Sequence, residues 1–294
     1  MVDKQNISET IKELMKINNI AKINLKDIQL KKKIGEGGQA KVYRGTYQNE
    51  EVAVKVLEEV DWKCLAHEIV IISNLHHNSI PKFYGIILED GIIGLVSKYI
   101  SGKPLDEYNI TEFNEKQKLQ IVKSLANALC YVHENKFIHR DLKPENIMID
   151  SNFNFFLIDF GIAKVVTGQD NAFTRAKGTV HYLAPETLDV AEVNESEEII
   201  SAITTQVDVW AYGCIVSYIF SEKLPWCNKY LDNSAVIQKL LVQKKEFPVP
   251  ADLIAAHKYS CGEAIVEIIK GCTINDPKKR FTMKKVSEIL NNIK

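Results

Sequence analysis

A glycine-bearing loop is the first feature of this chain that could do chemistry. It reads "IGEGGQAKV", residues 34–42; Gly35 and Gly37 fit a G-x-G-x-x-G pattern, and Ala40 replaces the third glycine. Glycines let the backbone approach phosphate oxygens with no Cβ in the way. The loop alone leaves three alternatives open: a dinucleotide site, a nucleotide triphosphate site or a plain turn.

The residues after the loop argue against two kinds of phosphate site. A dinucleotide site requires a helix after the loop and an acidic residue about 20 positions on. Here alternating strand residues follow, and Lys55 stands 20 positions after Gly35. A Walker loop is excluded because no G-K-[ST] follows. The remaining functional interpretation is a β-hairpin whose glycine turn covers phosphates.

Lys55 lies in the middle of the apolar strand pattern "VAVKVL". A lysine that faces inward from such a strand is costly unless it is paired. Two partners fit, a phosphate anion and a carboxylate. Glu68 on the next predicted helix is the candidate carboxylate, since its neighbours Ile69 and Ile72 are expected to face the sheet.

Three further motifs follow in the second half of the chain. They are "FIHRDLKPENIMI" (137–149), "FFLIDFGIAK" (155–164) and "GTVHYLAPE" (178–186). Together with the glycine loop and "VAVK", they stand in the order found in eukaryotic protein kinases. The chain resembles that family over roughly residues 28–292, and is most similar to serine/threonine kinases of the tyrosine-kinase-like group. The resemblance implies a two-lobed α+β fold, with a small β-rich N-lobe and a larger helical C-lobe.

The resemblance also implies roles in the transfer of phosphate from ATP. Lys55 would contact the α- and β-phosphates and be held by Glu68. Asp141 would accept the proton of the substrate hydroxyl or orient that hydroxyl, and Lys143 would stabilise charge on the transferred group.

Metal binding and structural support fall to other motif residues. By the resemblance, Asp159 and Asn146 would bind two Mg²⁺ ions, with Mn²⁺ as a substitute, and both side chains carry the oxygen donors that Mg²⁺ prefers. Glu186 and Arg280 resemble an ion pair that anchors the activation segment, and Asp208 an acid that binds the catalytic-loop backbone.

The adenine of ATP is expected between apolar walls and against the backbone of residues 98–100. Without the resemblance, the apolar members of this set would be interpreted as plain core. The ATP-binding candidates are Ile34, Gly35, Gly37, Val42, Ala53, Lys55, Ser97, Lys98, Tyr99, Ile100 and Met148.

The lysine two residues after Asp141 is typical of serine/threonine kinases, so protein Ser/Thr hydroxyls are the expected acceptors. The alternative is a catalytically weak pseudokinase that acts as a nucleotide-gated scaffold. The presence of Lys55, Asp141 and Asp159 favours the enzyme.

Regulation is expected between residues 159 and 186. Thr174 is the main candidate phosphosite and Thr167 the second, and Arg140 and Lys164 would bind the phosphate. An upstream kinase or autophosphorylation would supply it. The acidic stretch 187–207 is interpreted as a solvated insertion, or as a surface that repels acidic substrates or binds a basic partner.

The chain divides into an N-terminal extension, residues 1–24, and a kinase domain, residues 25–294. Within the domain the N-lobe is 25–100 and the C-lobe 101–294. The extension is predicted to contain an amphipathic helix with Ile7, Ile11, Leu14 and Ile17 on one face. Whether it packs on the domain or contacts a partner is left open.

Hydrophobic periodicity predicts the main elements. Val52, Val54 and Val56 recur at period two, residues 83–100 form a hairpin with its turn at 89–91, and residues 61–75 form a helix. A helix capped at Asn114 and Gln117 follows, and residues 207–220 form a buried central helix. The apolar stripe of the capped helix comprises Leu119, Val122, Leu125, Leu129 and Val132.

The overall composition argues against nucleic acid and membrane lipid as binding partners. A formal net charge of -1 over 294 residues gives no field that would draw the chain to nucleic acid. No apolar run reaches the ~18 residues of a membrane span. The six cysteines lack zinc spacing and are expected to be reduced thiols of a cytoplasmic protein, the nucleus not being excluded. The oligomeric state is left open.

Overall fold

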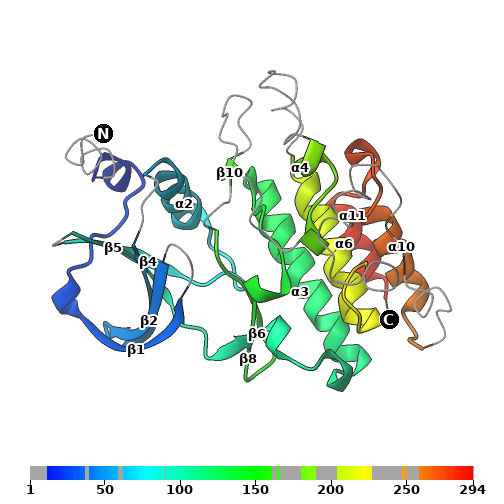
Figure 1. Cartoon of the computed structure of the whole chain (residues 1–294), viewed down its shortest axis with the longest axis horizontal. Coiled ribbons are helices and arrows are strands. Elements are labelled where there is room, and N and C mark those ends of the chain that lie inside the picture. Colours follow the sequence, from blue (N-terminus) through cyan, green and yellow to red (C-terminus); the bar gives the residue numbers. More distant parts are fainter. Residues whose placement is uncertain are drawn as a thin grey trace. The chain divides into compact units, whose positions relative to one another are not determined.

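The computed structural model describes residues 12–36, 40–58, 62–89, 91–160, 164–165, 180–189, 204–226, 247, 249 and 258–293. The chain divides into two compact units (Figure 1). The first comprises the residues up to Gly102 together with Met148–Lys164, and the second comprises Lys103–Ile147 and the residues from Val165 onward. Residues 148–164, which lie within the predicted C-lobe, belong with the first unit.

Five antiparallel strands form the sheet of the first unit, in the order β1-β2-β3-β5-β4. The strands are β1 Ile28–Glu36, β2 Ala40–Tyr47, β3 Glu50–Leu57, β4 Phe83–Glu89 and β5 Ile92–Lys98. The turn between β2 and β3 consists of Gln48 and Asn49, at φ of 49° and 63°. Two-residue hairpin turns commonly require this left-handed conformation at both positions.

The predicted helix at residues 61–75 is α2, Trp62–Asn74. It packs on one face of the sheet through Leu65 and Ile69, which cluster with Ile86 and Leu95. Successive residues of a strand point to opposite faces, and the other face buries Ile23, Ile28, Val52, Val54, Ile87 and Val96. Lys55 pairs with Leu95 across β3 and β5, so these two residues lie side by side on the face that α2 covers.

The N-terminal segment packs on β4 and α2 within the first unit. Residues 12–17 are helical, and Lys22 then forms a parallel bridge with Ile86 at the edge of β4. Within this helix the buried residue is Met15 (7% exposed), whereas Ile17 is 79% exposed. The predicted apolar face is therefore wrong for Ile17, because the docking at β4 turns Met15, not Ile17, toward α2. Ile7 and Ile11 lie outside the described residues.

Helices dominate the second unit. They are α3 Glu115–Glu134, α4 Glu186–Asp189, α6 Gln206–Ser221, α10 Gly262–Cys272 and α11 Met283–Asn291. Helix α6 packs against α3 and α10, and α11 packs against α3. The predicted capping box of α3 is present at Asn114 and Gln117, and α6 is buried along nearly its whole length, as predicted. The described part of the chain also contains five short strands. They are β6 Gly102–Pro104, β7 Phe137–Ile138, β8 Ile147–Asp150, β9 Phe155–Leu157 and β10 Lys164–Val165.

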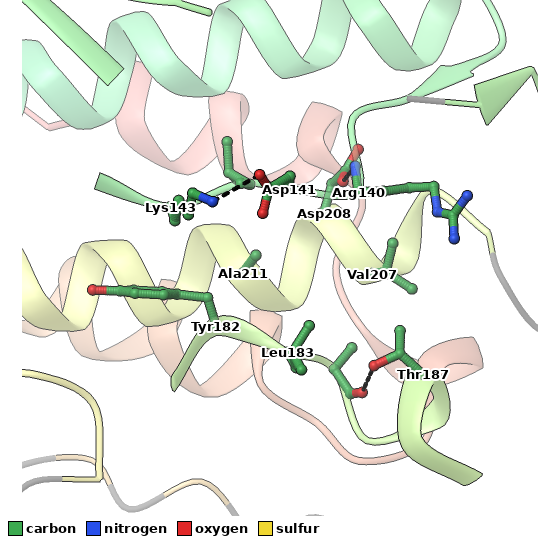
Figure 2. Close-up of a pocket in the computed structure, with 11 residues that line it drawn as sticks. Arg140, Asp141, Lys143, Tyr182, Leu183, Thr187, Val207, Asp208 and Ala211 are labelled. Atoms are coloured by element: carbon green, nitrogen blue, oxygen red, sulfur yellow. Dashed lines mark hydrogen bonds and ion pairs between the residues drawn. The ribbon is translucent and has the colours of Figure 1, made fainter. Parts of the chain in front are cut away.

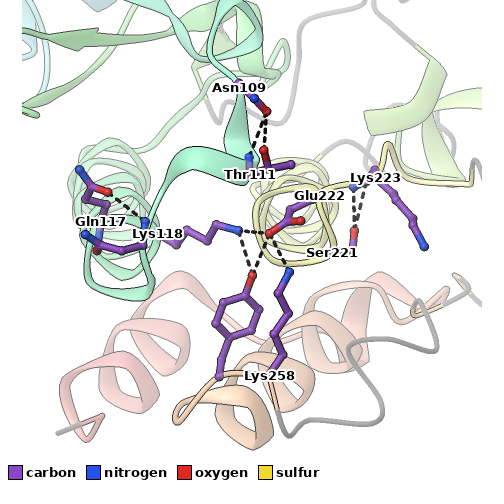
Figure 3. Close-up of polar contacts among 10 residues, drawn as sticks. Asn109, Thr111, Gln117, Lys118, Ser221, Glu222, Lys223 and Lys258 are labelled. Atoms are coloured by element: carbon purple, nitrogen blue, oxygen red, sulfur yellow. Dashed lines mark hydrogen bonds and ion pairs between the residues drawn. The ribbon is translucent and has the colours of Figure 1, made fainter.

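The predicted apolar stripe of α3 includes Leu119, and it does not include the buried lysine Lys118. Leu119 is only half-buried, whereas Lys118 is fully buried. Its Nζ donates to Glu222 Oε1 at 2.8 Å and to Tyr259 Oη at 2.9 Å (Figure 3). Lys258 also donates to Glu222 Oε1, at 2.8 Å. Burial acts to raise the pKa of Glu222, but the hydrogen bonds and charges of the two lysines outweigh it and lower that pKa to about 2. A charged network thus joins α3 to the end of α6.

The cysteines of the described part are free thiols. Cys214, Cys261 and Cys272 are buried and Cys130 is half-buried. The side chains of the other two cysteines lie outside the described residues. Among the described helices, none combines the length and the apolar character that crossing a membrane requires.

Candidate active site

Lys55 is held between two carboxylates of the first unit. Its Nζ lies 2.9 Å from Glu68 Oε1 and 3.1 Å from Asp159 Oδ1. Burial acts to lower the pKa of Lys55, but the charges of Asp159 and Glu68 outweigh it, and the pKa lies above its ordinary value. Lys55 is therefore a fixed cation, and the contact with Glu68 predicted from the sequence is present.

Strand register places the glycine loop next to this lysine. Gly35 pairs with Val42 across β1 and β2, and Val42 pairs with Lys55 across β2 and β3. Neighbouring strands lie about 4.8 Å apart, so the three residues form a row across the sheet. Gly37, the second glycine of the motif, lies outside the described residues.

The apolar candidates for an adenine site also belong to the first unit. Ala53 pairs with Ser97 across β3 and β5. Ile34 is 38% exposed, and Val42, Ala53 and Met148 are half-buried. Partial exposure is what a wall of an open binding site requires, whereas plain core residues would be buried.

The backbone amides after β5 differ in whether they have hydrogen-bond partners among the described residues. Lys98 N donates to Lys82 O at 2.8 Å, and Tyr99 N donates to Glu51 O at 2.9 Å. Ile100 is buried, yet its amide has no hydrogen-bond partner among the described residues. This amide is therefore a donor that a ligand acceptor could use.

Asp141, Lys143 and Asn146 form a compact polar group in the second unit, and Figure 2 shows the contact between Asp141 and Lys143. Lys143 Nζ lies 2.8 Å from Asp141 Oδ2. Asn146 Nδ2 donates to Asp141 O at 2.7 Å and to Asp141 Oδ2 at 3.0 Å. The Asn146 amide nitrogen thus donates to Asp141, and Oδ1 of Asn146 can act as an acceptor for other groups.

Asp208 of α6 fixes the backbone that carries Asp141. Its carboxylate, 1% exposed, accepts from His139 N at 2.8 Å, Arg140 N at 2.9 Å and His133 Nε2 at 2.9 Å. Arg140 has a left-handed φ of 68°, a conformation that costs a non-glycine residue about 1–3 kcal/mol. The hydrogen bonds to Asp208 hold Arg140 in this strained state. The sequence predicts Asp208 here but gives no signal for His133.

We expect Asp208→Asn to destabilise the fold by about 2 kcal/mol, because the new NH₂ group would face a backbone donor and leave it unsatisfied. The midpoint of urea denaturation measures the change. Asp276→Asn is the matched control, since Asp276 is an exposed N-cap and asparagine caps equally well. Equal midpoints for Asp208→Asn and the unmodified chain would contradict this role.

Glu186 and Arg280 form the predicted ion pair. Arg280 Nη1 and Nη2 donate to Glu186 Oε1 and Oε2 at 2.6 and 2.7 Å, and the Arg280 side chain is 0% exposed. The guanidinium also donates to the carbonyl oxygens of Ile274, Asn275 and Gln206. It lies 5.0 Å from the centroid of the Trp210 ring. The pair ties α4 to α6 and to the segment before α11.

A small pocket opens beside Asp141. Its lining includes Lys143, Leu183, Ala184 and Thr187 (Figure 2). Thr187 Oγ1 donates to Ala184 O at 2.6 Å, which fixes this wall. In Figure 2 the Arg140 side chain extends away from the Asp141–Lys143 pair. The pocket therefore offers a partly apolar wall next to a carboxylate and an ammonium group.

Of the predicted regulatory residues, Arg140 lies within the described part of the chain. Thr167 and Thr174 lie outside the described residues, as does the side chain of Lys164 and most of the acidic stretch 187–207.

Comparison with known proteins agrees with this geometry. The protein kinase domain family matches residues 28–290. Serine/threonine-protein kinase CTR1 of Arabidopsis thaliana is 26% identical over 90% of this chain and 31% of its own length. The probable serine/threonine-protein kinase gdt2 of Dictyostelium discoideum is 30% identical over 92% of this chain and 16% of its own length. The chain thus spans a third or less of these relatives. It belongs to the protein kinase family.

Proposed function

We propose that this chain transfers the γ-phosphate of ATP to serine and threonine hydroxyls of protein substrates. The observation that carries the proposal is the group formed by Asp141, Lys143 and Asn146 on a backbone fixed by Asp208. Family membership supports the reaction class, and so do the relatives, which are named as serine/threonine kinases.

The chemistry follows from charge and proton affinity. The acceptor oxygen forms a bond to the γ-phosphorus while the bond from that phosphorus to the β–γ bridging oxygen breaks, and ADP leaves. Asp141 accepts the proton of the acceptor hydroxyl. Lys143 neutralises charge on the transferred group, and Lys55, kept cationic by its two carboxylates, binds the α- and β-phosphates.

Magnesium would supply charge neutralisation at the phosphates. Asn146 Oδ1 and the half-exposed carboxylate of Asp159 are oxygen donors of the type that Mg²⁺ takes. No cluster of three or more His, Cys, Asp or Glu side chains that could hold a metal occurs in the described parts of the chain. Mg²⁺ is commonly bound by one or two carboxylates together with substrate phosphates.

ATP recognition is proposed for the edge of the first unit. The partly exposed Ile34, Val42, Ala53 and Met148 would contact the adenine, and the unpartnered amide of Ile100 would donate to a ring nitrogen. Ser97, which pairs with Ala53, would leave space behind the base because its side chain is small.

The direct test is incubation of the full chain with γ-labelled ATP, Mg²⁺ and a generic acceptor protein, followed by identification of the labelled amino acid. We expect phosphoserine and phosphothreonine. Label on tyrosine alone would contradict the acceptor class. Nucleotide binding without any transfer would favour the scaffold alternative.

Ala40, which replaces the third glycine of the loop, is expected to matter little. It begins β2 and pairs with Leu57, and it is not among the residues with positive φ, so alanine fits without strain. We expect Ala40→Gly to change the affinity for ATP by less than tenfold, or under ~1.4 kcal/mol. Titration with a fluorescent ATP analogue measures it; a larger loss would mean that the methyl group packs against the nucleotide.

Activation by phosphorylation is part of the same proposal. A phosphate on Thr174, or secondly on Thr167, would pair with Arg140 and Lys164. An upstream kinase or the chain itself would supply it.

A further inference from the structure

The N-terminal segment before the family domain contacts the helix that carries Glu68. The family match begins at residue 28, yet Met15 is buried in one cluster with Leu65 and Ile69 of α2. On a helix, residues three, four and seven apart share a face. Leu65, Glu68, Ile69 and Ile72 therefore lie together, with the carboxylate of Glu68 among side chains that pack in the Met15 cluster.

The same cluster also reaches the strand beside Lys55. Leu95, a member of the cluster, pairs with Lys55 across β3 and β5. Both partners of the Lys55–Glu68 contact thus adjoin one apolar cluster, and Met15 is the buried member supplied from outside the family domain.

Backbone hydrogen bonds anchor this segment. Ile86 N donates to Ala21 O at 3.0 Å, and Ile23 N donates to Ile86 O at 2.8 Å. Gly85 permits the approach: its φ is 152°, and a Cβ there would lie 2.3 Å from Ala21 O. Leu25 N also donates to Glu89 Oε2, at 2.8 Å. With residues 21–25 fixed to β4, the preceding helix is held where Met15 can contact α2.

We propose that Met15 is a positioning residue that acts through α2 to keep Glu68 on Lys55, so that residues 12–24 are an activating element of this chain. The inference rests on the proposed function, because Lys55 must be held to bind phosphates. Loss of the Met15 side chain would leave space on the inner face of α2, and α2 with Glu68 would then move away from Lys55 more often.

The test uses point variants of the full chain. We expect Met15→Ala to lower kcat/KM about three- to thirtyfold, the range for residues coupled to a site without touching it. Met15→Leu should restore activity, since leucine refills the volume. Ile17→Ala is the matched control in the same helix and should change nothing, because Ile17 is 79% exposed.

Two readouts separate positioning from general stability. In a Glu68→Gln background, Met15→Ala should have no further effect on kcat/KM, because residues that act as a unit are not additive. Hydrogen exchange of the α2 amides should accelerate in Met15→Ala while that of α6 stays unchanged. An equal loss in both backgrounds, or unchanged exchange in α2, would overturn the proposal. The exchange experiment needs no catalysis, so its outcome is independent of whether the chain transfers phosphate.

Discussion

Asp141→Asn is expected to lower the rate of phosphate transfer by about 10²–10⁴-fold, the contribution of a positioned general base. Asparagine has nearly the same shape, so the amide of Asn146 can still donate to the main-chain oxygen of residue 141. It cannot accept the substrate proton, and its contact with Lys143 loses one charge. The loss should therefore fall on kcat, with the affinity for ATP little changed.

Label transfer from ATP to a generic acceptor, under single-turnover conditions, measures this effect. Asp276→Asn serves as the matched control on the exposed surface of the same unit and should retain full activity. Equal transfer by Asp141→Asn and the unmodified chain would mean that another protein in the preparation carries the activity, or that Asp141 is not the base.

The second large effect is expected on stability, from Glu186→Gln. Removal of one charge of a buried ion pair leaves the other uncompensated and costs about 3–5 kcal/mol. Arg280 is 0% exposed and would keep its charge, because arginine is not deprotonated in proteins. The free energy of unfolding from urea denaturation measures the loss.

A double variant separates the cost of an unpaired charge from the value of the pair. Glu186→Leu combined with Arg280→Met removes both charges. Because no uncompensated charge then remains buried, the double variant should have a larger free energy of unfolding than Glu186→Gln. If the double variant were instead less stable than Glu186→Gln, the hydrogen bonds from Arg280 to carbonyl oxygens would contribute more to stability than the pairing of its charge. Arg280→Lys should also destabilise, since an ammonium group cannot reproduce the two parallel bonds to Glu186.

The sequence predicts best where residue type and motif spacing coincide. Glu68 on Lys55, Asp208 on the catalytic-loop backbone and Glu186 with Arg280 are all in contact as expected. The contact of Glu68 with Lys55 follows from the cost of leaving an inward-facing lysine unpaired. The other two contacts are those that the resemblance to protein kinases implies, and Asp208 binds backbone amides rather than a charge of opposite sign in the motifs.

The apolar periodicity predicts which helix residues are buried less accurately than the motifs predict the charged contacts. It misses Lys118 because a lysine normally marks a solvated face, but the partners Glu222 and Tyr259 lie more than 100 residues away in sequence. It puts Ile17 on a buried face that Met15 occupies, because the docking at Ile86 sets the rotation of that helix. Long-range contacts of this kind leave no local pattern.

The bridge between Lys22 and Ile86 has a consequence for how the chain behaves at high concentration. Strand β4 ends the order β1-β2-β3-β5-β4, and an uncovered edge strand offers unpaired N–H and C=O groups to other molecules. Ala21 and Ile23 form hydrogen bonds with the backbone N–H and C=O of Ile86. These groups are therefore not available to a strand of another molecule. A fragment that begins at residue 28, where the family match begins, would lack these hydrogen bonds. Its exposed β4 edge would then promote self-association.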